Sequence, residues 1–183
     1  PQNLQITVKE FIQLGTVSPK SLFQLSNRER EKVQKIIETI GLDEYANTRM
    51  ANLSGGQKQR AAIGKALASD ADLLLMDEPM VGVDGESRNS IMRLLDDLCH
   101  KQNKTIVMIS HDLASIKRTV HRMVYLEQKV RYDGPTLTFP DLSDLAELRG
   151  IEPTHPELDS ANHTEIKSED IISIIVPNSE SGE

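Results

Sequence analysis

The segment Leu53–Gln57, with the sequence Leu-Ser-Gly-Gly-Gln, has the residue types of a helix start that binds an anion. Ser54 is suited to cap a helix, because its side-chain oxygen can accept a hydrogen bond from a first-turn N–H. Gly55 and Gly56 let backbone N–H groups approach an anion closely, and the helix dipole favours negative charge there. The segment predicts a phosphate site, and an ordinary helix N-terminus after a turn is the alternative.

Two carboxylates follow at a distance suited to one helix, one turn and one strand. Asp77 and Glu78 end an apolar strand, and ligands of open α/β sheets bind beyond the carboxyl ends of strands. Asp77 can hold magnesium, directly or through water, while Glu78 can orient an attacking water or accept its proton. The alternative is a capping pair before a turn at Pro79. Together with Leu53–Gln57, the pair predicts handling of a nucleotide's phosphates and magnesium.

A third candidate, His111, directly follows the apolar run Thr105–Ile109 and is therefore expected at another strand's carboxyl end. Its imidazole can hydrogen-bond a terminal phosphate oxygen. Alone, it would be read as part of a helix-capping turn with Ser110 and Asp112. Its place after the other two segments favours the phosphate role.

Alternating helices and strands are expected to position these residues. Such alternation implies parallel pairing, and the nearly continuous apolar strands suit a sheet covered on both faces, so the predicted fold class is α/β. The expected elements are a helix from Ser54 through Ala68, the strand Leu73–Met76, a helix with Ile91, Leu94, Leu95 and Leu98 on one face, the strand Thr105–Ser110, and a hairpin of Met123–Leu126 with Val130–Tyr132.

Residues 4–50 predict a small helical layer. Thr7 and Glu10 form a capping box for a short helix that runs to about Gly15. Ser26 or Asn27 can cap the next helix. Its apolar positions recur at helical spacing, and a glycine supplies its stop: Val33, Ile36, Ile37, Ile40 and then Gly41.

Composition and charge limit the possible partners. The formal charge is -7 over 183 residues, and residues 141–183 hold 11 acidic and 2 basic residues against 17 and 19 in residues 1–140. A nearly neutral body without a basic stripe argues against nucleic acid as a partner. No apolar run approaches the roughly 20 residues that span a bilayer.

The expected organisation is a main domain over residues 1–140 and an acidic, largely flexible extension over 141–183. Within the first, residues 4–50 form the helical subdomain and 51–140 the α/β part. In the extension, residues 142–148 suit a short helix and residues 171–176 a strand. His155 and His163 raise the possibility of a metal sensor, but their spacing matches no ligand pattern and a solvated tail is preferred.

In their order and spacing, these segments resemble the ATP-binding cassette (ABC) ATPases. On this resemblance Leu53–Gln57 is similar to the signature motif, Leu73–Asp77 to the Walker B strand, and Glu78 to the catalytic carboxylate. The other matching positions are Gly82-Val83-Asp84 for the D-loop, His111 for the switch histidine and Gln2 for the Q-loop glutamine that senses magnesium and water. The match covers about residues 1–135, and the resemblance implies that residues 1–140 form a partial ABC ATPase domain.

The resemblance implies a P-loop NTPase-like core, a parallel sheet flanked by helices, with ATP and Mg²⁺ as ligands. In the family two cassettes sandwich two nucleotides head to tail, so Ser54, Gly55 and Gly56 would bind the γ-phosphate of ATP on a second subunit. Asp84 would act between subunits. The helical layer would grip an integral membrane permease at the cytoplasmic face of the membrane, with a solute-binding protein as an indirect partner.

The sequence departs from the family pattern at one motif. No Gly-x-x-x-x-Gly-Lys-Ser/Thr segment occurs in it, so the Walker A loop and its lysine are expected upstream of Gln2. The chain is therefore interpreted as a fragment that starts at the Q-loop. Alone it is expected to bind nucleotide poorly and to hydrolyse almost none.

Within the family, the segment Leu22–Leu25 before Asn27–Glu29, together with Val81–Asp84, is similar to the branch that imports zinc or manganese. The leading hypothesis is the ATPase subunit of such an importer. A soluble cassette ATPase that acts on ribosomes or DNA is the second, although paired cassettes, coiled-coil insertions and basic arms are not seen. A non-catalytic interaction domain is the third.

Overall fold

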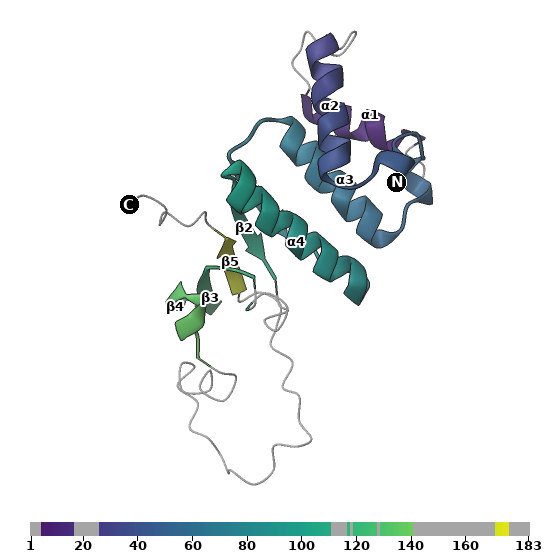
Figure 1. Cartoon of the computed structure of the whole chain (residues 1–183). Helices are drawn as coiled ribbons and strands as arrows, with labels where there is room; N and C mark the ends of the chain where they lie inside the picture. Colours follow the sequence, from purple (N-terminus) through teal and green to yellow (C-terminus); the bar gives the residue numbers. More distant parts are fainter. Residues whose placement is uncertain are drawn as a thin grey trace. The chain divides into compact units, whose positions relative to one another are not determined.

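The computed structural model describes residues 5–16, 26–110, 117, 119–127, 129–140 and 171–175. The chain divides into two compact units. The first comprises residues 1–74 and 80–98, and the second comprises residues 75–79 and 99–183. The path of the chain through both can be followed by colour in Figure 1.

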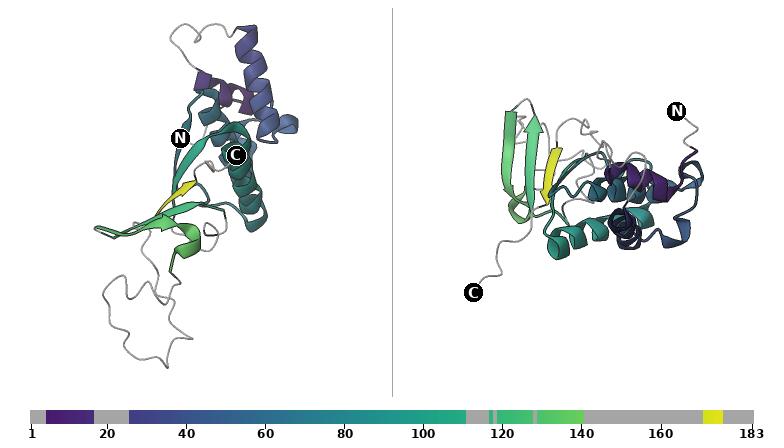
Figure 2. Two further views of the ribbon diagram at one scale, coloured as in Figure 1. Left: turned by 60° about the vertical axis from the view of Figure 1, so that its left-hand side comes forward. Right: turned by 90° about the horizontal axis from the view of Figure 1, so that it is seen from above.

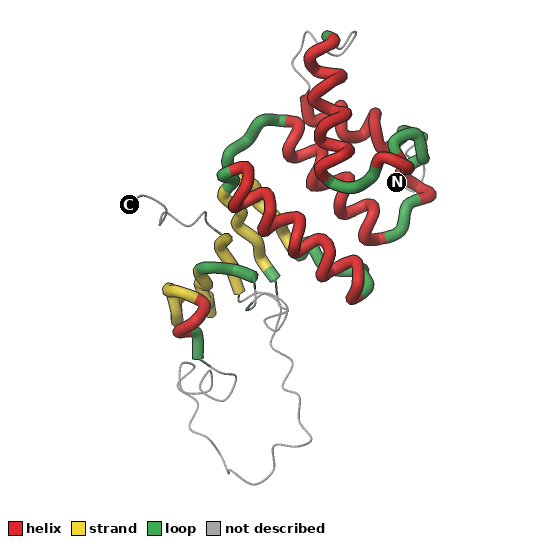
Figure 3. Tube along the Cα trace, viewed as in Figure 1, coloured by secondary structure: helices red, strands yellow, loops and turns green. Residues whose placement is uncertain are grey.

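Helices make up the first unit (red in Figure 3). The α-helices are α1 (Val8–Gln13), α2 (Asn27–Thr39), α3 (Gly55–Ala68) and α4 (Gly85–Gln102, of which residues 85–98 belong to this unit), with short 3-10 helices at Leu14–Thr16, Asp43–Tyr45 and Met50–Asn52. The predicted capping box of Thr7 with Glu10 is confirmed, and Ser26, rather than Asn27, caps α2 through a box with Glu29. Hydrogen bonds from Thr7 and Ser26 lower the pKa of the Glu10 and Glu29 carboxyls.

Close approach of α3 to its neighbours sets the core of this unit. A methyl group at Gly64 would lie 2.7 Å from Ile40 Cδ1 and 3.2 Å from Ile12 Cδ1. At Gly15 it would lie 2.0 Å from the backbone oxygen of Lys65. Since real Cβ atoms do not come this close, α1, α2 and α3 pack tightly only because glycine occupies both positions. The isoleucines are buried, as the helical spacing predicts.

The segment between α2 and α3 is fixed to the start of the first helix. Gly41 ends α2 with φ +65°, a conformation that suits glycine. Met50 N–H then donates to Ile6 O at 3.0 Å, while Val8 N–H donates to Thr48 O at 3.0 Å. Because the first N–H groups of a helix have no partner inside it, the second bond satisfies α1 and orders the approach to Leu53.

The strands form one sheet in the order β1-β2-β5-β3-β4. Their bounds are β1 Leu73–Asp77, β2 Thr105–Ile109, β3 Arg122–Glu127, β4 Lys129–Pro135 and β5 Ile171–Ile175. In the second unit, Glu78 N–H donates to Ile109 O at 2.9 Å, so β1 and β2 end at the same edge, as parallel strands do. The predicted α/β architecture with parallel pairing is confirmed for this pair.

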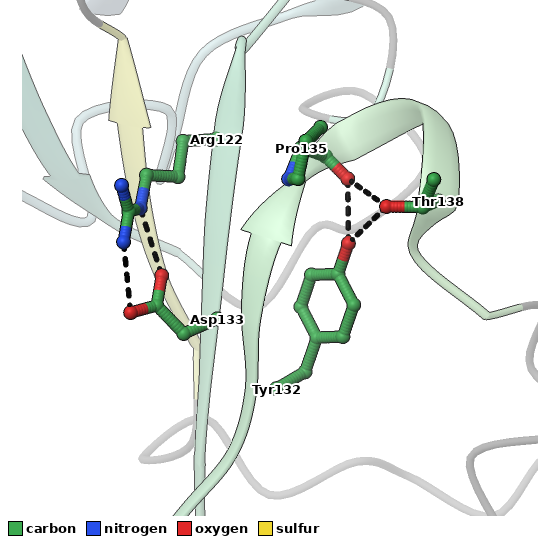
Figure 4. A network of polar contacts seen from close by, with 5 residues as sticks. All are labelled: Arg122, Tyr132, Asp133, Pro135 and Thr138. Carbon is green, nitrogen blue, oxygen red and sulfur yellow. Dashed lines mark hydrogen bonds and ion pairs between the residues drawn. The ribbon is translucent and has the colours of Figure 1, made fainter.

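The predicted hairpin is confirmed and is longer than expected. Strands β3 and β4 pair antiparallel from Arg122–Pro135 to Glu127–Lys129, with an irregularity after Tyr125. Arg122 forms a two-point ion pair with Asp133, with Nε–Oδ1 2.8 Å and Nη2–Oδ2 2.9 Å. Tyr132 Oη donates to Pro135 O at 2.6 Å (Figure 4). The two contacts hold the strands together and close the turn that follows β4.

Strand β5 joins residues distant in sequence. It pairs antiparallel with β2 on one side and with β3 on the other (yellow beside green in Figure 2). The strand character of residues 171–176 was readable in the sequence, but its place inside the sheet was not. The predicted helix at 142–148 lies outside the described residues.

Candidate functional site

The N-terminus of α3 has the local geometry that Leu53–Gln57 predicts. Ser54 caps the helix: its Oγ accepts from Gln57 N–H at 3.2 Å, and Gln57 Oε1 accepts from Ser54 N–H at 2.9 Å. Leu53 is buried and anchors the turn, whereas Ser54 and Gly55 are exposed. A hydroxyl that accepts one hydrogen bond still has its own proton to donate. The exposed helix start therefore presents donors suited to a phosphate.

The two glycines of this segment, Gly55 and Gly56, are required by helix packing as well as by the close approach of a ligand. A methyl group at Gly55 would lie 2.4 Å from Gly82 O, and one at Gly56 would lie 2.6 Å from Ser87 Cβ. The sequence-based argument used glycine only for close approach to an anion. In the structure the start of α3 also rests directly on Gly82 and on the first turn of α4, so the segments 53–57 and 82–84 are brought together.

Asp84 caps the helix that follows. Its Oδ1 accepts from Ser87 N–H at 2.9 Å, and its backbone oxygen accepts from Arg88 N–H at 2.8 Å. Hydrogen bonds from the backbone and side chain of Ser87 lower the pKa of the Asp84 carboxyl. Gly82, at φ +73°, makes the bend before it. The segment 82–84 is thus a fixed turn whose exposed carboxylate marks the start of α4.

This capping bond predicts a pH effect on stability. Because the folded-state pKa of Asp84 is depressed, its contribution is present above the ordinary value of 3.8 and is lost as pH falls through the folded-state pKa. Asp84→Asn keeps a side-chain oxygen but does not titrate. Urea unfolding of the two proteins from pH 7 to pH 3 is expected to show the wild type losing stability relative to the variant. Parallel pH profiles would contradict this role.

The carboxyl end of β1 carries the two predicted carboxylates in different environments. Asp77 is exposed, whereas Glu78 is half-buried and has φ +45°. Left-handed backbone at a residue with a Cβ costs about 1–2 kcal/mol. Such a conformation persists only where the surroundings impose it, and it is concentrated at functional sites. The Glu78–Ile109 backbone bond supplies part of that constraint.

Two predicted site residues, Gln2 and His111, lie outside the described residues. The bond from Glu78 to Ile109 nevertheless ties the end of β1 to the strand that leads into His111. Segments 53–57 and 82–84 lie in the first unit, and Asp77 and Glu78 lie in the second. The contact between segments 53–57 and 82–84 therefore lies within the first unit, and the two carboxylates lie within the second unit.

Comparison with known proteins assigns the family. Residues 2–81 match the family model described as ABC transporter. The chain is 33% identical over 153 residues to the zinc uptake system ATP-binding protein ZurA of Listeria innocua, a match that covers 80% of this chain and 60% of that protein. This chain belongs to the ABC transporter family.

A relative named for a different cargo and a solved cassette structure agree with this assignment. The thiamine import ATP-binding protein ThiQ of Yersinia pestis is 36% identical over 137 residues, covering 74% of this chain and 57% of ThiQ. A dimeric ATP-binding cassette in a post-hydrolysis state, bound to ADP and Pi, superposes with a TM-score of 0.60 at 30% identity, covering 73% of this chain and 58% of that one. The chain thus spans about three-fifths of the length of these relatives.

Two contacts of this ABC chain were not expected from the sequence. Gly56 packs against the side chain of Ser87. Arg60 donates hydrogen bonds to Ile40 O at the end of α2 and to Ser90 Oγ in α4. The Ser87 contact joins residues 31 positions apart and leaves no local signal. Arg60 did leave one, because it lies on the same helical stripe as the buried residues Gly56, Ile63, Gly64 and Leu67. A charged residue on that stripe needs a specific partner.

Proposed function

We propose that the intact protein is the ATP-hydrolysing subunit of an ABC importer, which couples ATP binding and hydrolysis in a cassette dimer to transport through a membrane permease. The observation that carries the proposal is Glu78: a half-buried carboxylate in left-handed backbone, directly after an apolar strand and tied to Ile109. Strain at that position is expected where a side chain must be aimed at a reacting group. The family relationship supports the proposal that this group is the water that attacks the γ-phosphate of ATP.

In this proposal the carboxylate of Glu78 orients the attacking water and accepts its proton. His111 hydrogen-bonds the terminal phosphate, and Gln2 senses the water and the metal ion. The start of α3 acts on a different nucleotide, held by a second copy of the cassette. There Ser54 Oγ and the N–H groups of Gly55 and Gly56 donate to the γ-phosphate, and Leu53 and Gln57 hold the turn in place.

The residues at the end of β1 fit a magnesium ion. Among the described residues no three His, Cys, Asp or Glu side chains gather as a metal cluster. Mg²⁺ does not need such a cluster, because it is usually held by one or two carboxylates together with substrate phosphates and water. Asp77 is an exposed carboxylate suited to this role, and Mg²⁺ bound there would neutralise phosphate charge.

Dimerisation is part of the proposal, since the start of α3 and the end of β1 would each complete a site with another cassette. A dimeric relative bound to ADP and Pi supports this. Asp84 follows Gly82 by two residues, and Gly82 packs against Gly55 at the start of α3. We propose that Asp84 contacts the second subunit. No helix of the described part of the chain is long and apolar enough to cross a membrane. We place the subunit at the cytoplasmic face, bound to a permease through residues 4–50.

The proposed cargo is zinc or manganese, delivered to the permease by a solute-binding protein. The match to the zinc uptake protein covers 80% of this chain, against 74% for the match to the thiamine import protein. Identities of 33% and 36% do not separate the two cargoes. The ATPase need not contact the cargo, so transport must be measured directly.

Uptake of zinc, manganese and thiamine in a strain that lacks the intact protein tests this function. Uptake of zinc, manganese or both is expected to fall, and to return with the wild-type gene but not with Glu78→Gln, while thiamine uptake stays constant. Unchanged uptake of both metals would refute the metal assignment. A purified intact protein without ATPase activity would refute the function itself.

A further inference from the structure

Arg60 joins three helices of the first unit at one point. From the second turn of α3, its Nη1 donates to Ile40 O at 2.6 Å and its Nη2 donates to Ser90 Oγ at 2.5 Å. Ile40 is the C-terminal cap of α2, and Ser90 lies in the second turn of α4. A methyl group at Gly41 would lie 3.3 Å from Nη1, so the guanidinium also lies against the bend that ends α2.

The chemistry of this contact favours a fixed position for the side chain. Arg60 is half-buried, and burial lowers the pKa of its guanidinium, which nevertheless stays charged at neutral pH. Both hydrogen-bond partners are neutral oxygen atoms. The end of α2 has the partial negative charge of a helix C-terminus, which attracts a cation, and the planar guanidinium presents donors in two fixed directions. A lysine would offer one compact charge instead.

The hydrogen bond from Arg60 to Ser90 lies about one turn from the start of α3. Gly56 packs on Ser87, and Arg60 bonds Ser90, so α3 contacts α4 at two points three or four residues apart on each helix. Ser87 is in turn held by the Asp84 cap. Through Arg60, the end of α2 is therefore connected to the same part of α4 that positions the segments 53–57 and 82–84.

We propose that Arg60 is a positioning residue that locks the end of α2 to the start of α4, so that segments 53–57 and 82–84 keep one geometry relative to the helical layer 4–50. In the proposed importer, the permease would displace the helical layer. The side chain of Arg60 would transmit this displacement to segment 53–57, which contacts the ATP held by the second cassette. The activity part of the inference rests on the proposed function, whereas the structural part does not.

Two readouts on the intact protein test the proposal. Arg60→Met keeps an unbranched stem but removes both donors, and it is expected to speed amide hydrogen exchange about tenfold or more at the end of α2 and in the first turns of α4. It is also expected to lower kcat for ATP about tenfold or more with KM within about twofold, because small misplacements of catalytic contacts cost up to about 10²-fold. Arg60→Lys should recover part of the kcat.

Lys32→Met is the matched control. Lys32 Nζ also bonds a helix C-terminus in this unit, donating to Ala68 O at 2.6 Å, and it pairs with Asp70 at 2.6 Å. These contacts tie α2 to the opposite end of α3. In the intact protein assayed without a permease, the control should loosen that end without changing kcat or exchange at the start of α4. An equal loss of kcat in both variants would refute the positioning role.

A double-mutant cycle with Ser90→Ala completes the test. The effect of Ser90→Ala on kcat and on exchange should disappear in the Arg60→Met background, since the two side chains act through one bond. Additive effects, or wild-type exchange in Arg60→Met, would overturn the inference. If Arg60→Met does not fold, Ser90→Ala alone decides through the same exchange measurement. If the intact wild type hydrolyses no ATP, the proposed function fails, and exchange still decides the role of Arg60.

Discussion

Glu78→Gln in the intact protein is expected to lower ATP turnover by roughly 10²- to 10⁴-fold while ATP binding is retained. General-base and water-orienting groups typically contribute that much, and a neutral amide can neither accept the proton nor attract the water as strongly. Gln keeps the length of the side chain and the same Cβ, so the left-handed backbone at φ +45° is unaffected. Turnover measured beside the Kd for ATP separates chemistry from binding.

Glu86→Gln provides the matched control for this experiment. It makes the same chemical change at an exposed carboxylate in the first turn of α4, eight residues along the chain. Turnover and the thermal midpoint should both stay near those of the wild type. If Glu78→Gln also retained normal turnover, the strain at Glu78 would need a purely structural cause and the carboxylate would lose its proposed role.

The parts of the fold that were predictable from sequence are those determined by neighbouring residues. Helix caps are local: the box at Thr7–Glu10 is present as predicted from residue type and spacing, and one of the two predicted caps of α2, Ser26, is the one that forms. The hairpin β3–β4 is also local, because its two strands follow each other in the sequence and pair antiparallel. The α/β alternation follows from hydrophobic periodicity, which needs only a short window of sequence.

The parts that were not predictable depend on contacts between distant residues. Strand β5 pairs with β2 across more than sixty residues, and an apolar pentapeptide does not reveal which strands it will join. The positive φ of Glu78 carries no signal in residue type, since glutamate rarely adopts it. At Gly55, residue type suggested an anion site, and the contact with Gly82 supplied a second reason that the sequence could not show.

Gly55→Ala is expected to damage both stability and turnover, because the added methyl group has no space. It would lie 2.4 Å from Gly82 O and 3.4 Å from Gly82 C, and both atoms belong to a backbone turn fixed at φ +73°. Overpacking of this kind typically costs about 1–3 kcal/mol. Segment 53–57 is proposed to contact the partner's nucleotide, and Asp84 in segment 82–84 is proposed to contact the partner subunit. Because both segments would be displaced, turnover should fall by up to about 10²-fold.

Gly85→Ala tests whether the contact, rather than the loss of glycine, is responsible. Gly85 is the first residue of α4, immediately after Asp84, and a methyl group there meets nothing within 4 Å. Alanine also suits a helix better than glycine by up to about 1 kcal/mol, so this variant should be neutral or slightly more stable and fully active. Urea unfolding and steady-state turnover on both variants measure the difference. Equal behaviour of the two would mean that the start of α3 does not depend on the turn at Gly82.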